Sequence, residues 1–243
     1  MIVNQLPLVY YPHLRKQFHE LYSWCTEDHG IFHICCVLRD AQRMCEKFGI
    51  RYTREIELGC VLHDIGNRYT RSRHDIVGGN MTREFLKEND LEDEVNVEEV
   101  VAAVEHHRSG YKGERKTDTE IIVACADRGI PLTDRDRILN EVFLRAVVYS
   151  INNLHMDSVS AVDSAYEYCM DEESGKDWSI YEEIYIKHYW KQLNRKREIM
   201  NTISIDEVRK YAHDHGIGTE IIVSWYKIVG FDPTFLYGLY EKS

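Results

Sequence analysis

Apolar residues recur at helical spacing along this chain, and no other feature constrains its fold as strongly. Between Ile31 and Phe48 they fall three or four residues apart, which places them on one face of a helix. Similar stripes recur in five later segments, which begin near residues 53, 73, 97, 117 and 133. No segment alternates apolar and polar residues as a half-buried strand does. The sequence therefore predicts an all-α fold.

Start and stop signals divide these stripes into separate helices. Thr53 is a typical N-cap, and Gly66 is expected to end the helix that follows it. Capping-box patterns occur at residues 117–120, 179–182 and 204–207. Beyond about residue 150 the pattern stays helical, but few candidate functional residues occur. We therefore expect a functional domain over residues 1–150 and a helical C-terminal extension over residues 151–243.

The charge and cysteine content disfavour several classes of protein. With a formal net charge of −11, the chain does not resemble proteins that coat nucleic acid by counterion release. Its 7 cysteines are odd in number and form no CxxC pair, which favours a reducing compartment over a disulfide framework. No apolar run approaches the ~20 residues of a membrane span, and the first residues lack the basic region of a signal peptide. We expect a cytoplasmic protein with neither membrane nor nucleic acid as its partner.

Histidine and aspartate residues stand near the ends of separate predicted helices. Five of the 12 histidines lie there together with two aspartates: His33, His63, Asp64, His74, His106, His107 and Asp127. A single histidine on an apolar helix is usually an ordinary core residue. Burial of this many imidazoles and carboxylates without a bound cation, however, would be unfavourable. Because these groups are the usual ligands of Zn, Fe, Mn and Ni, the pattern predicts a site for one or two metals.

The adjacent pair His63 and Asp64 suits a two-metal site. His63 can serve as a terminal ligand while the carboxylate of Asp64 bridges two ions. Two ions about 3.5–4 Å apart can clamp a phosphoryl group and generate hydroxide near neutral pH. We therefore expect metal-activated hydroxide to be the nucleophile, whereas the sequence assigns no general acid.

Four segments, HGIFHICCVLRDA, LGCVLHDIG, EHHRSGY and CADRG, carry a resemblance to a known family. In their order and helical context they resemble the HD-domain superfamily of metal-dependent phosphohydrolases, over about residues 28–150. The resemblance implies an α-helical bundle that binds one or two divalent ions, of Fe, Mn, Ni, Zn, Co or Mg. It also implies hydrolysis of a nucleotide or of another phosphate mono- or diester.

The resemblance further implies a role for each candidate ligand. A first metal would be held by His33, His63, Asp64 and Asp127, and a second by Asp64, His74, His106 and His107. Asp64, as the bridge, and His74 are assigned to catalysis. The chain departs from the branch that hydrolyses cyclic dinucleotides, because Asn67 stands where Lys is usual and Lys112 where Pro is usual. That particular activity is therefore not predicted.

A phosphorylated small-molecule substrate needs cations beside the metals. The loops after the His-Asp pair and after the His-His pair supply arginines and lysines, of which we predict Arg68 and Lys112 to bind substrate. Any single loop arginine or lysine is, however, more often a solvated surface residue than a substrate-binding one. Asp75, Glu105 and residues 27–29 could orient ligand imidazoles or move protons.

Two other functions remain open at this level. Some members of the superfamily hold a mixed-valent di-iron centre that oxidises C–H bonds with O2, and their ligand spacing is shared. A non-catalytic metal-binding module that contacts a partner is the second alternative. The C-terminal helices are expected to pack over the first half of the chain or across a homodimer. Residues 204–229 also outline a helix-turn-helix, although two helices joined by a glycine turn are common without DNA binding.

Overall fold

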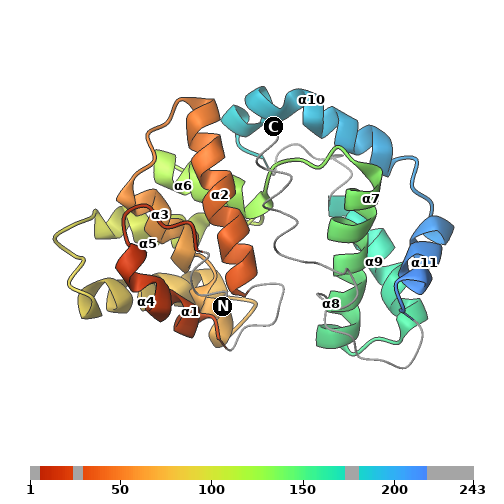
Figure 1. Ribbon diagram of the computed structural model, residues 1–243, viewed down its shortest axis with the longest axis horizontal. Coiled ribbons are helices and arrows are strands. Elements are labelled where there is room, and N and C mark those ends of the chain that lie inside the picture. The colour runs from red at the N-terminus through yellow and green to blue at the C-terminus, as the bar shows by residue number, and fades with distance from the viewer. Residues whose placement is uncertain (1–5, 24–29, 173–180, 218–243) are drawn as a thin grey trace. The chain divides into compact units, whose positions relative to one another are not determined.

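The computed structural model describes residues 6–23, 30–172 and 181–217, and all regular structure in these ranges is helical (Figure 1). This result confirms the predicted all-α fold. The described residues fall into two compact units. The first takes in the chain up to Ile130 together with residues 181–189, and the second takes in the rest, from Pro131 and from Trp190 onward. The expected boundary at residue 150 between domain and extension stays a prediction.

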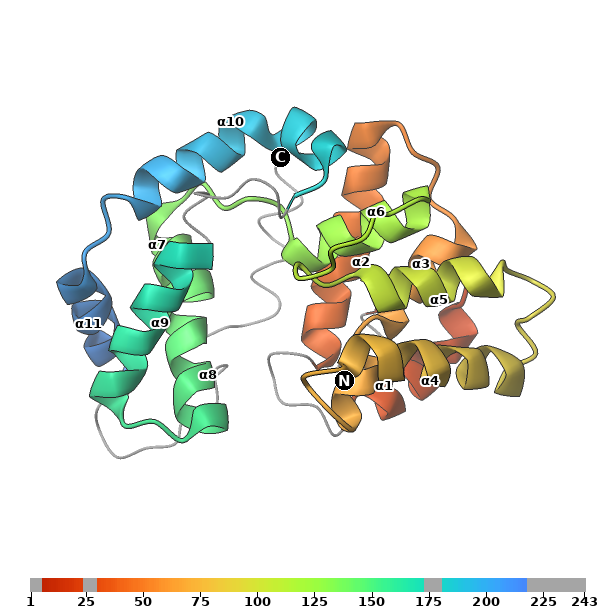
Figure 2. The same ribbon diagram turned by 180° about the vertical axis from the view of Figure 1, so that it is seen from behind.

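The first unit is a helical bundle that contains every candidate ligand. Its elements are η2 (Pro12–Leu14), α1 (Arg15–Leu21), α2 (Ile31–Phe48), α3 (Arg54–Leu62), η3 (Ile65–Arg68), α4 (His74–Glu88), α5 (Val97–His106) and α6 (Asp118–Arg128). Helices α3, α5 and α6 pack against one another, α2 packs on α3 and α6, and α4 packs on α5 (Figure 2). Helices far apart in the sequence therefore become neighbours.

The apolar stripes and caps read from the sequence build this bundle. On α2 the buried stripe includes Ile34, Val37, Leu38, Ala41 and Met44. The hydroxyl of Thr53 accepts a hydrogen bond from the amide of Ile56 and so caps α3. Both reciprocal bonds of the capping box are present at the start of α6. Each cap satisfies amide groups that a helix start leaves without a partner.

Gly66 has a different role from the predicted one, because α3 already ends at Leu62 and Gly66 lies within η3. A Cβ atom built on Gly66 would lie 2.0 Å from the carbonyl oxygen of His74 and 2.6 Å from the amide nitrogen of Gly78. Glycine is needed here because the backbone of η3 lies directly against the first turns of α4. This close approach brings the two segments that carry Asp64 and His74 together.

The second unit consists of α7 (Arg135–Ile138), the π-helical turn η4 (Leu139–Leu144), α8 (Arg145–Leu154), α9 (Ser158–Glu172), most of α10 (Glu183–Met200) and α11 (Ile205–Asp214). The first turns of α10 belong to the first unit. Asp134 caps α7. The predicted capping box at residue 204 is present in part, since Ser204 accepts a hydrogen bond from the amide of Glu207. Ser179 and residues 218–229 lie outside the described residues.

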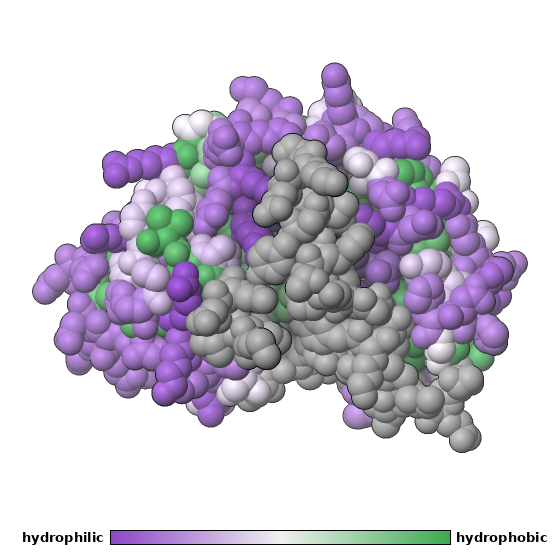
Figure 3. Space-filling model, in the orientation of Figure 1, coloured by the Kyte–Doolittle hydropathy of each residue, from purple (hydrophilic) through white to green (hydrophobic). Residues whose placement is uncertain are grey.

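The described residues on the face seen in Figure 3 are mainly hydrophilic, and apolar ones lie in small separate groups. Among the described helices, none combines the length and the apolar character that a membrane crossing requires.

Candidate metal centre

Four predicted ligands from three places in the sequence meet in a first cluster. His33 lies in the first turn of α2, His63 caps the end of α3, and Asp127 lies in the last turn of α6. The Nε2 atom of His33 lies 3.1 Å from Nε2 of His63 and 3.1 Å from Oδ1 of Asp127. Oδ2 of Asp64 completes the group, 3.4 Å from Nε2 of His63 and 3.7 Å from Nε2 of His33.

The other oxygen of Asp64 faces a second cluster. Its Oδ1 atom lies 3.4 Å from Nε2 of His74, the first residue of α4, and 3.8 Å from Nε2 of His107, which follows α5. The two Nε2 atoms of His74 and His107 are 3.1 Å apart. His63, Asp64, His74 and His107 are all buried, so these polar groups converge in the interior. His33, His63 and Asp64 in the first cluster lie close enough together to hold one metal ion, and so do Asp64, His74 and His107 in the second.

The hydrogen bonds of His74 and His107 test whether a cation fits the second cluster. Their Nδ1 atoms lie 2.7 Å from the carbonyl oxygen of Arg71 and 2.6 Å from that of Val104. A carbonyl only accepts, so each Nδ1 carries the hydrogen and each neutral ring presents a lone pair at Nε2. Two facing lone pairs repel unless they share a cation. Two nitrogens bound to one ion at about 2.1 Å would lie about 3.0–3.4 Å apart, which matches the observed separation.

Three of the four clustered imidazoles also favour the protonation state that binds metal. Burial lowers the pKa of His33, of His74 and of His107, the last to about 4. Burial alone would also lower the pKa of His63, but the carboxylates of Asp64 and Asp127 beside it raise that pKa well above the usual value. Three of the four imidazoles are therefore neutral near pH 7, which is the form that binds metal.

The same balance acts on Asp127. Burial would raise the pKa of its carboxyl group, but hydrogen bonds from His33 and His63, together with the charge of His63, hold that pKa well below the usual range. Asp127 is therefore an ionised carboxylate at neutral pH, and it can serve as an anionic ligand of the first cluster.

His106 was predicted as a metal ligand, and its side chain lies apart from both clusters. Its Nδ1 atom is 2.6 Å from Oε2 of the buried Glu120, and its ring stacks on Tyr111 with 4.1 Å between centroids. Neighbouring residues at a helix end point in different directions, so only His107 of the pair faces Asp64. The sequence pattern could not show which of the two adjacent histidines faces Asp64.

The two predicted substrate-binding residues are both exposed. The guanidinium of Arg68 lies over the ring of Tyr69, 5.8 Å from its centroid. Within the described ranges, no hydrogen bond or ion pair joins Arg68 or Lys112 to the clusters. Arg108 is the loop cation beside the second cluster, because its Nη1 atom donates to the carbonyl of Ser72 at 2.9 Å and lies 3.6 Å from Oδ1 of Asp75.

Asn67, noted in the sequence only as a departure from a family pattern, contacts the centre directly. Its Nδ2 atom donates to Oδ1 of Asp64 at 2.8 Å, which fixes the orientation of the shared carboxylate. A polar residue three positions after Asp64 was the available signal, since such spacing permits a contact across one tight turn. Among the residues expected to orient ligand imidazoles or move protons, Asp75 contacts Arg108. Residues 27–29 lie outside the described residues.

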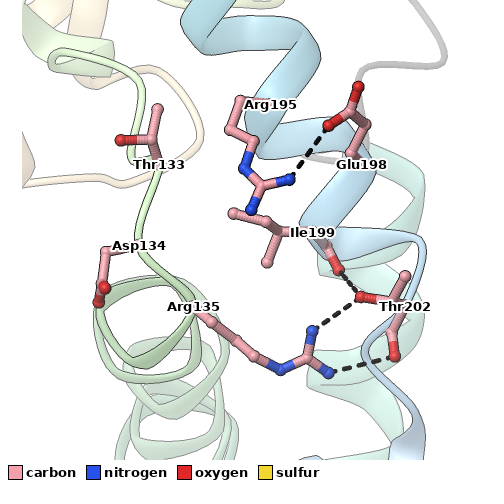
Figure 4. Close-up of a pocket in the computed structure, with 7 residues that line it drawn as sticks. All are labelled: Thr133, Asp134, Arg135, Arg195, Glu198, Ile199 and Thr202. Atoms are coloured by element: carbon pink, nitrogen blue, oxygen red, sulfur yellow. Dashed lines mark hydrogen bonds and ion pairs between the residues drawn. The ribbon is translucent and has the colours of Figure 1, made fainter.

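A pocket of about 440 Å³ occurs in the second unit, between the start of α7 and the end of α10 (Figure 4). Arg195 and Arg135 extend into it, but both are engaged in ion pairs. Arg195 pairs with Glu198 at 3.2 Å, and Arg135 pairs with Glu207 and bonds to Thr202. This pocket therefore offers an anion little free positive charge.

Comparison with known proteins addresses the first unit. A family model described as HD domain matches residues 30–130, which include every predicted ligand. No curated protein and no solved structure matches the chain. The matched segment is helical throughout its regular structure and contains the His63-Asp64 pair with both histidine clusters. The chain therefore contains an HD domain over residues 30–130.

Proposed function

We propose that this protein is a metal-dependent phosphohydrolase that acts on a nucleotide or another small phosphate ester. The observation that carries the proposal is the position of Asp64, which directs one oxygen to His33 and His63 and the other to His74 and His107. A carboxylate shared in this way is what two adjacent divalent ions require. The superfamily relationship of the domain supports the same chemistry.

The chain's own residues would divide the work between two positions. His33, His63 and Asp127 would hold one ion, His74 and His107 the other, and Asp64 both. Divalent ions bound there would supply a hydroxide nucleophile at neutral pH and would neutralise charge on a phosphoryl group. Asn67 would keep Asp64 oriented through its amide hydrogen bond. We further propose Arg68, Lys112 and Arg108 as the cations that bind the phosphorylated substrate.

The test is an activity screen with metal analysis of protein purified without oxygen. Nucleotides and simple phosphate mono- and diesters would be offered to the protein loaded with Mn, Fe, Ni, Zn, Co or Mg. We expect metal-dependent release of phosphate or a nucleoside monophosphate that needs no oxygen. Asp64→Ala should lose metal and activity together, whereas Asp206→Asn, a change at an exposed carboxylate on α11, should retain both. Oxygen-dependent turnover without phosphate release would instead identify a di-iron oxygenase and overturn the proposal.

Metal binding with neither reaction would point to the non-catalytic interaction module. That outcome would also reject the proposal, because the two clusters would then serve a structural role.

A further inference from the structure

Residues 181–189, called here the return segment, lie against the HD domain although about fifty residues separate them from its matched end. Tyr185 and Tyr189 of this segment are both buried. Tyr189 contacts the end of α2, where the Nζ atom of Lys47 lies 4.1 Å from its ring centroid. The rings of Tyr181 and Tyr185 are parallel, with 5.1 Å between centroids. The sequence led us to expect C-terminal helices packed over the first half of the chain, but it did not show which residues make the contact.

Tyr185 fixes the backbone that follows Asp127. Its hydroxyl donates a hydrogen bond of 2.6 Å to the carbonyl oxygen of Gly129, the residue that caps α6. The next amide, that of Ile130, donates to Oδ2 of the buried Asp40 on α2. Burial raises the pKa of the Tyr185 phenol, so its hydroxyl stays protonated and remains a donor. The turn after Asp127 is thus held from two sides.

Glu182 reaches the other cluster through Arg115. Its Oε1 atom lies 2.6 Å from Nη1 of Arg115, whose side chain is only 7% exposed. The remaining nitrogens of that guanidinium donate to the carbonyl oxygens of His106 and Arg108, each at 2.8 Å. These two carbonyls flank His107 on both sides. Arg115 therefore fixes the backbone around a ligand of the second cluster, and Glu182 holds Arg115.

We propose that the return segment positions the metal ligands, with Tyr185 acting on Asp127 and Glu182 acting on His107. The proposal rests on the metal centre of the proposed function but not on phosphate hydrolysis. Groups that orient a metal ligand change metal affinity about 10–100-fold when they are removed. A segment that only stabilised the fold would instead lower the unfolding temperature and leave the affinity for metal unchanged.

The experiment measures metal affinity in the full chain. Stepwise Mn²⁺ and Zn²⁺ binding would be measured by calorimetry and by competition with a coloured chelator. The variants are Tyr185→Phe, which removes one hydroxyl, and Glu182→Gln, which removes one charge. Matched controls are Tyr168→Phe, at a tyrosine 61% exposed on α9, and Glu183→Gln, at an exposed neighbour of Glu182. We expect about tenfold weaker binding at one step in each test variant and no change in the controls.

Double variants assign each effect to its ligand. If Tyr185 acts through Asp127, then Tyr185→Phe should have no further effect on metal affinity in an Asp127→Asn background. Glu182→Gln should likewise have no further effect in a His107→Gln background. Wild-type affinity in both single variants, or fully additive effects in both cycles, would overturn the proposal.

A measurement on the unaltered protein guards against variants that fail to fold. Coupling is reciprocal, so metal binding should also stabilise the return segment. Hydrogen exchange at residues 181–189 should therefore slow when metal is added, and unchanged exchange would contradict the proposal. If the wild type binds metal but releases no phosphate, only the proposed function fails. If it is active while both variants bind metal normally, only the positioning role fails.

Discussion

His74 and His107 face each other across 3.1 Å through their Nε2 atoms, while the Nδ1 atom of each ring is committed to a backbone carbonyl. This pairing fixes the tautomer of both rings and directs two lone pairs to one point. Asp64 lies next to both rings, and its carboxylate adds a negative charge at the position where the two lone pairs meet. That charge favours a bound cation over a neutral molecule.

Removal of the shared carboxylate should affect both metal positions. We expect Asp64→Asn to reduce activity more than about 100-fold, because loss of a direct ligand exceeds the 10–100-fold effect of an outer partner. Elemental analysis of the purified variant should show less metal at both positions. Retention of wild-type metal content and activity would show that Asp64 is not the bridge.

Substitution of His106 and of His107 should have different effects on the number of metal ions bound. His107→Gln should remove one metal-binding step, because its Nε2 atom faces Asp64, whereas His106→Gln should keep the wild-type stoichiometry. Calorimetric titration with Mn²⁺ distinguishes the two. Loss of a binding step in His106→Gln would show that His106 is also a metal ligand, as the sequence predicted.

The buried imidazole of His107 should make the metal-free protein sensitive to acid. Burial lowers its pKa from 6.5 to about 4, so below pH 6.5 the unfolded chain binds a proton that the folded chain does not. Stability should therefore fall as the pH drops from about 6.5 to about 4, by about 3 kcal/mol from this group. Urea unfolding with a chelator present, at pH 7, 5.5 and 4, measures the slope.

In that experiment His107→Gln should show the shallower pH dependence, and His213→Gln is the control because His213 is 80% exposed on α11. Equal slopes in wild type and His107→Gln would mean that another group causes the acid sensitivity.

The close approach at Gly66 should make it intolerant of a side chain. Gly66→Ala places a Cβ atom against backbone atoms of His74 and Gly78, which cannot move as a flexible side chain could. We expect destabilisation of about 1–3 kcal/mol or more and weaker binding of the second metal, because the clash displaces His74. Gly110→Ala is the matched control, since nothing lies within 4 Å of its added Cβ. Thermal unfolding and metal titration would be compared, and equal behaviour of the two variants would disprove the backbone contact.

Sequence reasoning identified the helices because their causes are local. The buried stripe of α2 follows from 3.6-residue periodicity, and the caps at Thr53 and Thr117 follow from hydrogen bonds within four residues. The prediction for Gly66 was wrong because its reason is not local: the contact is with α4, which begins eight positions later.

The candidate ligands could also be recognised from residue type and order, but their directions could not. His106 and His107 cannot be told apart by residue type, yet His106 faces Glu120 and His107 faces Asp64. In the sequence Arg115 cannot be distinguished from the other loop cations. In the structure its guanidinium is buried and donates hydrogen bonds to Glu182 and to two backbone carbonyls. Which nitrogen meets which oxygen depends on helix rotation and packing, which one-dimensional patterns do not contain.

The sequence by itself determined an all-α chain and a set of imidazoles and carboxylates near helix ends, because periodicity, capping and ligand chemistry act over short stretches. Only the tertiary structure decided that Asp64 divides its two oxygens between two histidine pairs and that Tyr185 returns to fix the turn after Asp127. These contacts join residues up to about sixty positions apart, and burial of apolar helix faces, rather than any local signal, brings them together.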